Sequence, residues 1–234
     1  MDARYEIHLN DDDYATTYLE SNYHFRIFED HIECSHNQKS IPFDSTGITN
    51  LIIFVDSKIL NATIHIFNYV TSIVSLDVLG WSEHIPKLEK VSCNGFKNLY
   101  INECKVFAIF SADAGKVHLR YVDVNTIYLF NPMTKVFLTN CSVWGMMNTG
   151  RVIEQLTLLD STIKLIKIDT QTIYTLQMIG KSSIGRLYAY IHDYEAKVMN
   201  NIKQSSYMST EINNFTDVSN ISPKIIEYFL VESL

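Results

Sequence analysis

The sequence has few of the residues that force sharp turns or form covalent cross-links: eight glycines, four prolines and four cysteines among 234 residues. Four cysteines are too few for the disulfide framework of a small secreted scaffold. No apolar run approaches the roughly 20 residues that span a bilayer, and the longest strong run covers only residues 51–55. The N-terminal region shows no basic segment followed by an apolar stretch, so no signal peptide is recognised. These scarcities predict neither a disulfide scaffold nor a membrane span.

The chain also lacks a basic excess, since 19 Lys and Arg residues stand against 26 Asp and Glu residues, for a net charge of −7. Nucleic-acid binders usually show the opposite balance, so this class of protein is not expected. Apolar residues make up 47% of the chain and charged residues 19%, which is a globular composition and excludes intrinsic disorder. At roughly 150 residues per domain, we expect one or two domains.

What is present is a repeat of the form apolar-x-x-apolar-x-apolar, which recurs about every 20 residues. All the apolar positions are filled in each of the seven copies, and the spacings between their second members are 25, 23, 18, 19, 20 and 20 residues. These spacings lie within or just under the range of leucine-rich repeats. The copies are Ile48-Leu51-Ile53, Ile73-Leu76-Val78, Phe96-Leu99-Ile101, Ala114-Val117-Leu119, Met133-Val136-Leu138, Ile153-Leu156-Leu158 and Ile173-Leu176-Met178.

Several copies continue as the leucine-rich-repeat motif does, with a small residue three positions after the last aliphatic residue and another aliphatic two further on. The clearest of these pairs are Cys104 with Val106, Cys141 with Val143, and Ser161 with Ile163. We expect the second and third apolar members to point into the core from a short strand. The small residue then turns the chain and forms hydrogen bonds to neighbouring repeats, and repeats stack to share one core.

The sequence therefore predicts an α/β solenoid, an irregular leucine-rich-repeat horseshoe with short parallel strands on its concave face. A parallel β-helix and an all-β sandwich are the alternatives. We divide the chain into an N-terminal segment with a cap strand (1–47), the repeat array (48–192) and a helical C-terminal cap (193–234). The cap strand is expected at residues 23–27 after a polar, acidic loop, and the cap helices at 193–203 and from Ser222-Pro223 onward.

Searches for catalytic and metal-binding motifs predict no site. Gly180-Lys181-Ser182 resembles the end of a phosphate-binding loop, but Thr175 stands where that motif needs its first glycine. A calcium site at residues 11–13 and a zinc site at His31, Cys34 and His36 are weaker readings than solvated surface loops. We therefore expect no enzyme activity, no metal and no cofactor.

The cysteines are expected to be free. Cys104 and Cys141 occupy one repeat position two repeats apart, near 10 Å at about 4.8 Å per strand, which is too far for a disulfide. Cys93 is placed to reach an adjacent repeat. Cys34, nearer the exposed N-terminal end, is placed to pair with something outside the chain.

Between the inward positions of the strands lie residues that point outward and line the concave face. The middle outward row is predicted to contain Tyr100, His118 and Phe137, flanked by Lys116, Arg120 and Lys135. Aromatic residues and arginine dominate binding energies at interfaces. This aromatic and basic patch on an acidic protein is our candidate surface for a protein partner, with scattered surface residues as the alternative. His118 predicts pH sensitivity near 6–7.

Across about residues 25–190 the chain resembles the leucine-rich-repeat superfamily, and residues 41–78 resemble the first repeats of secreted leucine-rich-repeat immune proteins of insects such as mosquitoes. The residues that carry this second resemblance are Phe43 to Leu51, Asp56-Ser57-Lys58-Ile59, a helix bearing Ile66-Phe67, and Leu76-Asp77-Val78. The chain departs from these proteins in having no recognised signal peptide, no asparagine at the repeat turn and no flanking cysteine pairs.

The resemblance implies an extracellular, non-enzymatic recognition protein of innate immunity that binds a protein partner through its concave face. Sequons at Asn61, Asn214 and Asn220, and one at Asn140 beside Cys141, fit a secreted glycoprotein. The alternative is a cytoplasmic adaptor or substrate receptor that docks through its C-terminal helix.

Overall fold

The computed structural model describes residues 3–9, 22–34, 39–56, 60–81, 85–148, 152–194 and 226–229. All its regular elements are strands, and these residues contain no helix. The early strands are β1 (Ala3–Leu9), β2 (Asn22–Ile27), β3 (His31–Cys34), β4 (Lys39–Pro42), β5 (Ile48–Asp56), β6 (Leu60–Asn68), β7 (Ser75–Trp81), β8 (Lys87–Asn94) and β9 (Asn98–Asn102). The later strands are β10 (Lys105–Ser111), β11 (Lys116–Arg120), β12 (Asp123–Leu129), β13 (Met133–Thr139), β14 (Ser142–Asn148), β15 (Val152–Leu159), β16 (Thr162–Ile179), β17 (Ser183–Tyr194) and β18 (Ile226–Phe229).

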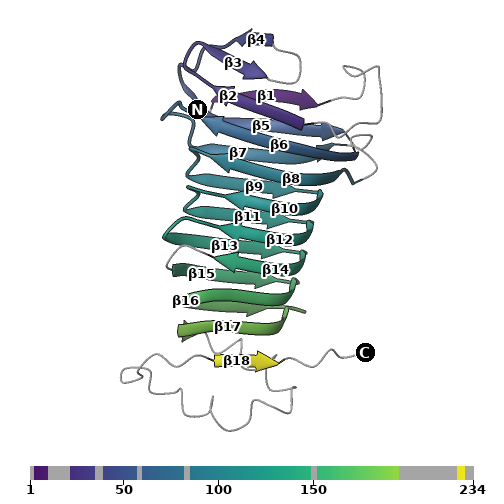
Figure 1. Cartoon of the computed structure of the whole chain (residues 1–234), viewed down its shortest axis with the longest axis vertical. Helices are drawn as coiled ribbons and strands as arrows, with labels where there is room; N and C mark the ends of the chain where they lie inside the picture. The colour runs from purple at the N-terminus through teal and green to yellow at the C-terminus, as the bar shows by residue number, and fades with distance from the viewer. Residues whose placement is uncertain are drawn as a thin grey trace.

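Most strands pair in parallel with the strand two positions further along the chain, so the strands form two ladders (Figure 1). The first ladder is purely parallel and runs through β1, β5, β7, β9, β11, β13, β15 and the end of β16. The second ladder contains β2, β6, β8, β10, β12, β14 and the starts of β16 and β17. It is mixed, because β3, β4 and β18 join it in antiparallel pairing.

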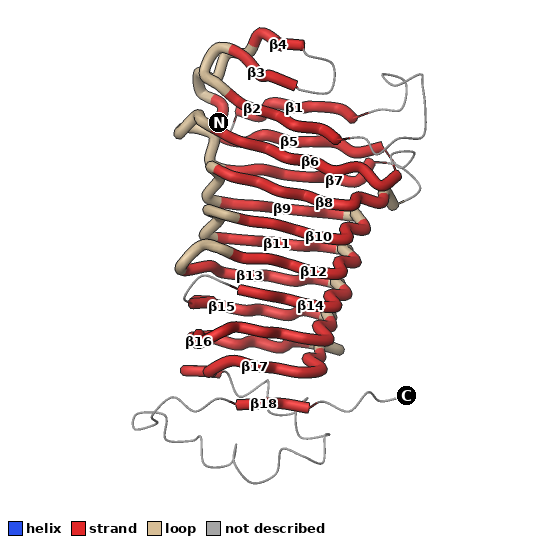
Figure 2. The backbone as a smooth tube through the Cα atoms, in the orientation of Figure 1, coloured by secondary structure: helices blue, strands red, loops and turns tan. Residues whose placement is uncertain are grey.

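Figure 2 shows short loops joining the two ladders along both sides of the molecule. On one side, each of four successive repeats turns at a corner residue with a positive φ. These corner residues are Glu103, Tyr121, Asn140 and Asp160. The N–H of each corner residue donates a hydrogen bond to a carbonyl of the next repeat; for example, Tyr121 N–H donates to Thr139 O at 2.9 Å. A single left-handed residue thus redirects the chain at this corner in successive repeats, which is why few glycines and prolines suffice.

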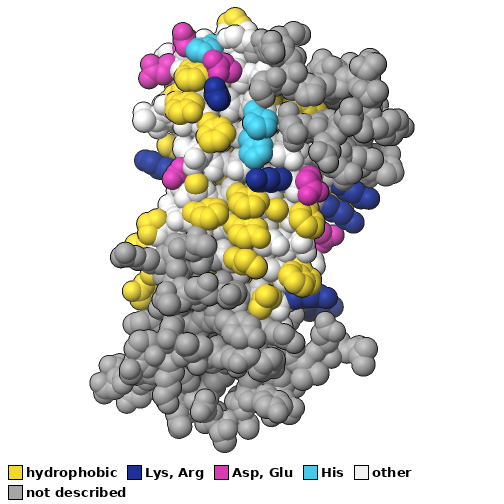
Figure 3. Space-filling model, viewed as in Figure 1, with side chains coloured by type: hydrophobic (Ala, Val, Ile, Leu, Met, Phe, Trp, Pro, Cys, Tyr) yellow, Lys and Arg dark blue, Asp and Glu magenta, His cyan; other side chains and the backbone are white. Residues whose placement is uncertain are grey.

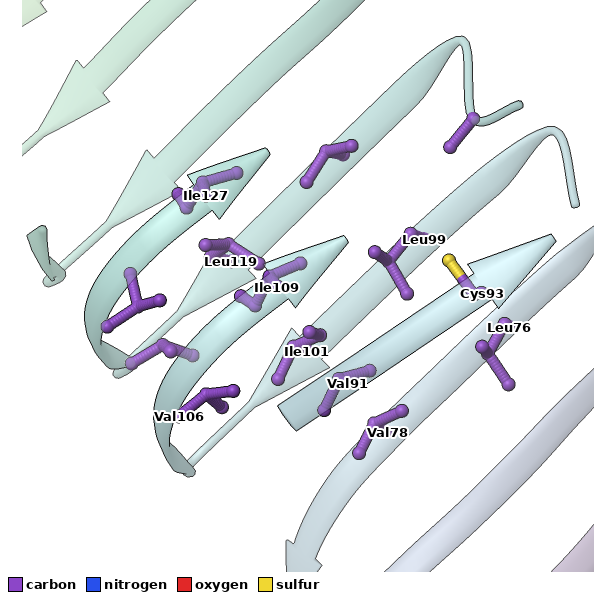
Figure 4. Packing of buried hydrophobic residues seen from close by; sticks show 14 of the residues in the cluster. Leu76, Val78, Val91, Cys93, Leu99, Ile101, Val106, Ile109, Leu119 and Ile127 are labelled. Carbon is purple, nitrogen blue, oxygen red and sulfur yellow. The ribbon is translucent and has the colours of Figure 1, made fainter. Parts of the chain in front are cut away.

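The predicted repeat register is confirmed. The second members of all seven copies stand opposite one another in the first ladder, from Leu51 through Val117 to Leu176. These side chains are 0–2% exposed and pack against inward residues of the second ladder, such as Val91 and Ile109 (Figure 4). Burying this continuous apolar layer is the dominant stabilising contribution.

Of the small residues predicted at the repeat turn, Ser161 forms a hydrogen bond to a neighbouring repeat as expected. Ser161 Oγ donates to Leu159 O at 2.8 Å and accepts from the Cys141 N–H of the preceding repeat at 3.0 Å. Ser182 Oγ likewise accepts from Ser161 N–H at 3.2 Å. The Cys141 thiol donates to Thr139 O at 3.2 Å. These groups are buried, so the hydrogen bonds satisfy polar atoms that solvent does not reach.

The helical part of the fold prediction is wrong in the described residues. Ile66-Phe67, expected on a helix, lie in the strand β6. The C-terminal helix expected after Ser222-Pro223 is contradicted at residues 226–229, which form β18. A helix was also expected at 193–203. Its first two residues, 193–194, belong to the strand β17, and the residues from 195 onward lie outside the described residues. The helix at Ile66-Phe67 was implied by the resemblance to insect proteins, whereas the C-terminal helices were predicted from short apolar spacings that do not distinguish a helix from a strand.

The N-terminal segment was also predicted only in part. Residues 23–27 form a strand as expected, and β2 pairs in parallel with β6. The region before it was expected to be a loop, but β1 extends the first ladder by pairing with β5. Polar and apolar residues alternate along β1, which is typical of a strand. The loop was predicted instead because acidic residues follow this segment.

Candidate functional site

The candidate patch lies on the outward side of the first ladder, where its residues stand in three neighbouring rows. Tyr100, His118 and Phe137 face one another across β9, β11 and β13. The rings of Tyr100 and His118 have centroids 5.8 Å apart at 51°, and those of His118 and Phe137 lie 5.7 Å apart at 57°. The three side chains are half-buried. The predicted juxtaposition is therefore present.

Lys116 is the basic residue that contacts the aromatic row. Its Nζ lies 5.5 Å from the centroid of Tyr100 and 5.4 Å from that of Phe137. These distances allow cation–π attraction to both rings. Lys116 forms no ion pair with any described residue. Its charge therefore remains available to an anionic group of a partner.

The other two predicted cations differ from Lys116. The Arg120 guanidinium lies 5.1 Å from the ring of Tyr121, at the corner that follows β11. The Lys135 ammonium forms an ion pair with Glu154 Oε1 at 2.9 Å. Lys135 is thus already neutralised by a neighbouring repeat, so Lys116 and Arg120 carry the positive character of the patch.

His118 has an unusual titration behaviour for this position. Partial burial lowers the pKa of the imidazole, and the charges of Lys116 and Arg120 lower it further. The pH sensitivity of binding that was expected near pH 6–7 from His118 is therefore displaced toward lower pH. At neutral pH the ring is uncharged and serves as an aromatic and hydrogen-bonding surface.

A hollow of about 480 Å³ adjoins the patch and shares Tyr100 with it. Asn50, Ser75 and Asp77 line it from the neighbouring strands. Burial raises the pKa of the Asp77 carboxyl, and the charge of Arg4 on β1 opposes that shift. The aromatic patch thus passes into a polar hollow with one carboxyl group at its edge.

The remaining predicted residues fall outside any assembled site. Asn61 belongs to β6, but its side chain is not described, and Asn214 and Asn220 lie outside the described residues. Asn140 is exposed at a left-handed corner. His36 also lies outside the described residues, while His31 contacts Asp30 at 2.7 Å. No group of three potential metal ligands occurs in the described part of the chain.

Gly180-Lys181-Ser182, which resembles a phosphate-binding loop, is one of the chain corners. Gly180 has φ +69°, and a Cβ atom there would collide with the Asp160 carboxylate. That carboxylate accepts the Lys181 N–H at 2.9 Å. The glycine is therefore required by the packing of two corners, and an acidic oxygen occupies the place where the loop would hold phosphate.

The cysteines are free and buried, as predicted for Cys104 and Cys141. Cys34 is 6% exposed, so the expectation of an accessible thiol is wrong in this structure. Burial raises the pKa of the thiols of Cys93 and Cys104 to about 12. Such thiols are unreactive near neutral pH.

Sequence reasoning missed the outward side of the second ladder. Phe110 and Tyr128 stack there at 4.5 Å and 12°, and His24 and His65 lie 4.6 Å apart further along the ladder. Figure 3 shows neighbouring histidine side chains and a group of hydrophobic side chains on one face of the molecule. The signal was available, because Ser92, Phe110, Tyr128 and Met147 recur every 18 or 19 residues, in step with the repeat.

Comparison with models of known protein families finds no match, and comparisons with curated proteins and with solved structures find none either. In the described residues there is no helix with the length and apolar character that crossing a membrane would require.

Proposed function

We propose that the chain is a non-enzymatic binding module built on a solenoid, whose two ladders are the two sides of successive coils. The support is the parallel pairing of strands two positions apart with one repeat register throughout. An elongated array of this kind offers long outward rows of side chains for contact with a partner. We keep a leucine-rich-repeat type of coil in the proposal. In this coil, strands of the second ladder take the place of the helices that were expected on the outer side.

The partner we propose is a protein that presents acidic and apolar groups to Tyr100, His118, Phe137, Lys116 and Arg120. The observation that carries this proposal is the tilted aromatic row with the Lys116 ammonium beside two of its rings. Tilted, half-buried rings beside unneutralised cations match the composition of binding hot spots. Partner carboxylates would complement the charge of Lys116 and Arg120.

We place this binding in extracellular recognition, in keeping with the resemblance to secreted immune proteins. The cytoplasmic adaptor alternative relied on a C-terminal helix, and residues 226–229 form a strand instead. Intact mass of the protein from its native source, before and after deglycosylation, tests the compartment. Loss of glycan mass from Asn61, Asn214 or Asn220 is expected. An unmodified chain would favour the adaptor.

Site-specific photocrosslinking tests the surface itself. A photoreactive residue at His118 should capture one polypeptide from the native source, and Tyr100→Ala with Phe137→Ala should abolish that capture. The expected loss of affinity in the double variant is at least about tenfold, the scale of a hot-spot truncation. Tyr128→Ala on the second ladder is the matched control and should leave capture unchanged. Equal capture by the double variant would contradict the proposal.

A further inference from the structure

The hollow beside Tyr100 contains polar groups that the fold itself does not use. It has a volume of about 480 Å³ and is lined by residues of β5, β7 and β9. This size falls within the range of small-molecule sites, roughly 300–1,000 Å³. The strand register assembles the hollow, because Asn50 is the partner of Ser75 and Asp77 is the partner of Tyr100 on neighbouring strands.

Asp77 is the charged group of this hollow, and its carboxylate lacks a donor. The side chain is half-buried and forms no hydrogen bond or ion pair with the residues that the structure describes. Burial raises the pKa of this carboxyl, and the charge of Arg4 on β1 opposes the shift. A carboxylate that is partly removed from water without a donor gains free energy when a ligand supplies one.

The polar groups around Asp77 are also available. Thr49 Oγ1 is buried and has no hydrogen-bond partner in the described part of the chain. The side-chain amides of Asn50 and Asn102 form no hydrogen bond with described residues. Ser75 Oγ accepts from Asn98 Nδ2 at 3.1 Å, which leaves the Ser75 O–H as a donor. Amides and hydroxyls both donate and accept, so the hollow presents both kinds of group to a ligand.

The charges around the hollow favour a neutral ligand. The Lys116 ammonium lies 5.5 Å from the centroid of the Tyr100 ring, and the charge of Arg4 acts on Asp77 from β1. These two cations would repel an ammonium or guanidinium group that enters the hollow, and Asp77 would repel an anion. Tyr100 adds an aromatic ring, whose negative face attracts weakly positive C–H groups. A neutral molecule that carries hydroxyl groups on a C–H framework meets all of these conditions.

We propose that the hollow binds a neutral saccharide, whose hydroxyl groups donate to Asp77 and exchange hydrogen bonds with Asn50 and Asn102 while Tyr100 packs against the sugar ring. A hydroxyl that donates to a carboxylate forms a charge-assisted hydrogen bond, which is about twice as strong as a neutral one. The saccharide is either a free sugar or the end of a glycan chain. The site goes beyond the protein-binding patch and does not rest on it, although Tyr100 borders both.

Binding is measured by NMR titration of the backbone amides with the methyl glycosides of glucose, galactose, mannose and N-acetylglucosamine. At least one glycoside should shift the amide signals of Asn50, Asp77 and Tyr100 and leave those of the second ladder in place. Asp77→Asn should weaken its binding at least about tenfold, because the hydroxyl then loses a charged acceptor. Glu89→Gln is the matched control, since it changes an exposed carboxylate of β8 in the same way and should bind like the native chain.

Two further probes test the charge of the ligand and its source. n-Butylammonium chloride should shift the same amides less than the best saccharide does at equal concentration. A released N-glycan that binds more tightly than the methyl glycoside of its terminal sugar identifies a glycan chain as the ligand, and equal binding identifies the single sugar. Both results support a saccharide site.

The controls also keep this proposal separate from the protein-binding patch. Asp77→Asn should still capture the protein partner through a photoreactive residue at His118, and Phe137→Ala should keep the saccharide affinity. The saccharide proposal is overturned if no glycoside shifts these amides, if n-butylammonium binds more tightly, or if Asp77→Asn binds the glycoside like the native chain. Loss of saccharide binding in Phe137→Ala would place the sugar on the patch and would also overturn it.

Discussion

The two ladders share one core and one strand spacing, yet the aromatic clusters at the middle of their outward faces are arranged differently. On the first ladder the rings of Tyr100, His118 and Phe137 are tilted by 51° and 57° and lie more than 5 Å apart. On the second ladder Phe110 and Tyr128 are nearly parallel at 4.5 Å. Stacked rings cover each other's faces and present their edges, whereas tilted rings leave part of their faces open to a partner.

The same comparison holds for the histidines. His118 lies between two aromatic rings and beside Lys116, while His65 lies against a second imidazole and near Lys90. One backbone register can therefore carry different side-chain surfaces on its two sides, depending only on the outward residues.

The largest effect is expected in the core that both ladders share. Leu99→Ala removes a fully buried side chain and should lower the free energy of unfolding by about 2–5 kcal/mol. Tyr100→Ala, the next residue and part of the outward row, should cost less than about 1.5 kcal/mol. Urea unfolding of the two variants measures the difference. Equal losses would mean that Tyr100 belongs to the core rather than to a surface.

A smaller effect is expected at the corner that joins the ladders. Ser161→Ala leaves the buried Cys141 N–H without its acceptor and should cost about 1–3 kcal/mol. Val122→Thr is the comparison, because it places a hydroxyl at the same repeat position in an apolar environment. If Ser161→Ala unfolds at the same urea concentration as the native chain, the corner hydrogen bond contributes no stability.

The histidines predict how stability depends on pH. The pKa values of His65 and His118 lie below the ordinary 6.5, so the native state takes up protons less readily than the unfolded chain. Their contribution is complete above that value and is lost as pH falls below it, until each native pKa is passed. Urea midpoints between about pH 8 and pH 5 should therefore fall less steeply in the double variant His65→Asn with His118→Asn. If the urea midpoint of the double variant depends on pH as steeply as that of the native chain, the native pKa values of His65 and His118 are not lowered.

The smallest effect is expected at the lysines that lie over aromatic rings. Lys116→Met and Lys90→Met should each change stability by less than about 1 kcal/mol, since exposed cation–π contacts are weak. Lys116→Met should weaken partner capture through His118, whereas Lys90→Met on the second ladder should leave that capture unchanged. Equal weakening of capture by the two variants would mean that the effect of Lys116 is not specific to the first ladder.

The register of the first ladder could be predicted because its apolar spacing is fixed by the core. Leu51, Leu99 and Val136 cannot leave their row without exposing apolar surface, so the outward residues Tyr100, His118 and Phe137 were placed correctly between them. The ion pair of Lys135 with Glu154 could not be predicted, because side-chain direction at the surface is not set by the repeat.

The second ladder was missed because its strands bend. In β10 and β12 two consecutive residues are buried, Ala108 with Ile109 and Thr126 with Ile127, which interrupts the period of two. The alternation therefore resembled the irregular outer side of a leucine-rich repeat. Short apolar runs do not distinguish the two structures without knowledge of what they pack against.

The measurement that tests the central claim most directly is cross-linking of paired cysteines in the first ladder with a bifunctional thiol reagent that fluoresces only when both ends react. Tyr100→Cys with His118→Cys should give strong fluorescence, because these residues are direct partners on neighbouring strands. Tyr100→Cys with Thr157→Cys, three strands apart, should give none. The native thiols are buried and contribute little background. No bridge in the first pair, or equal bridging in both, would contradict the register that assembles the patch.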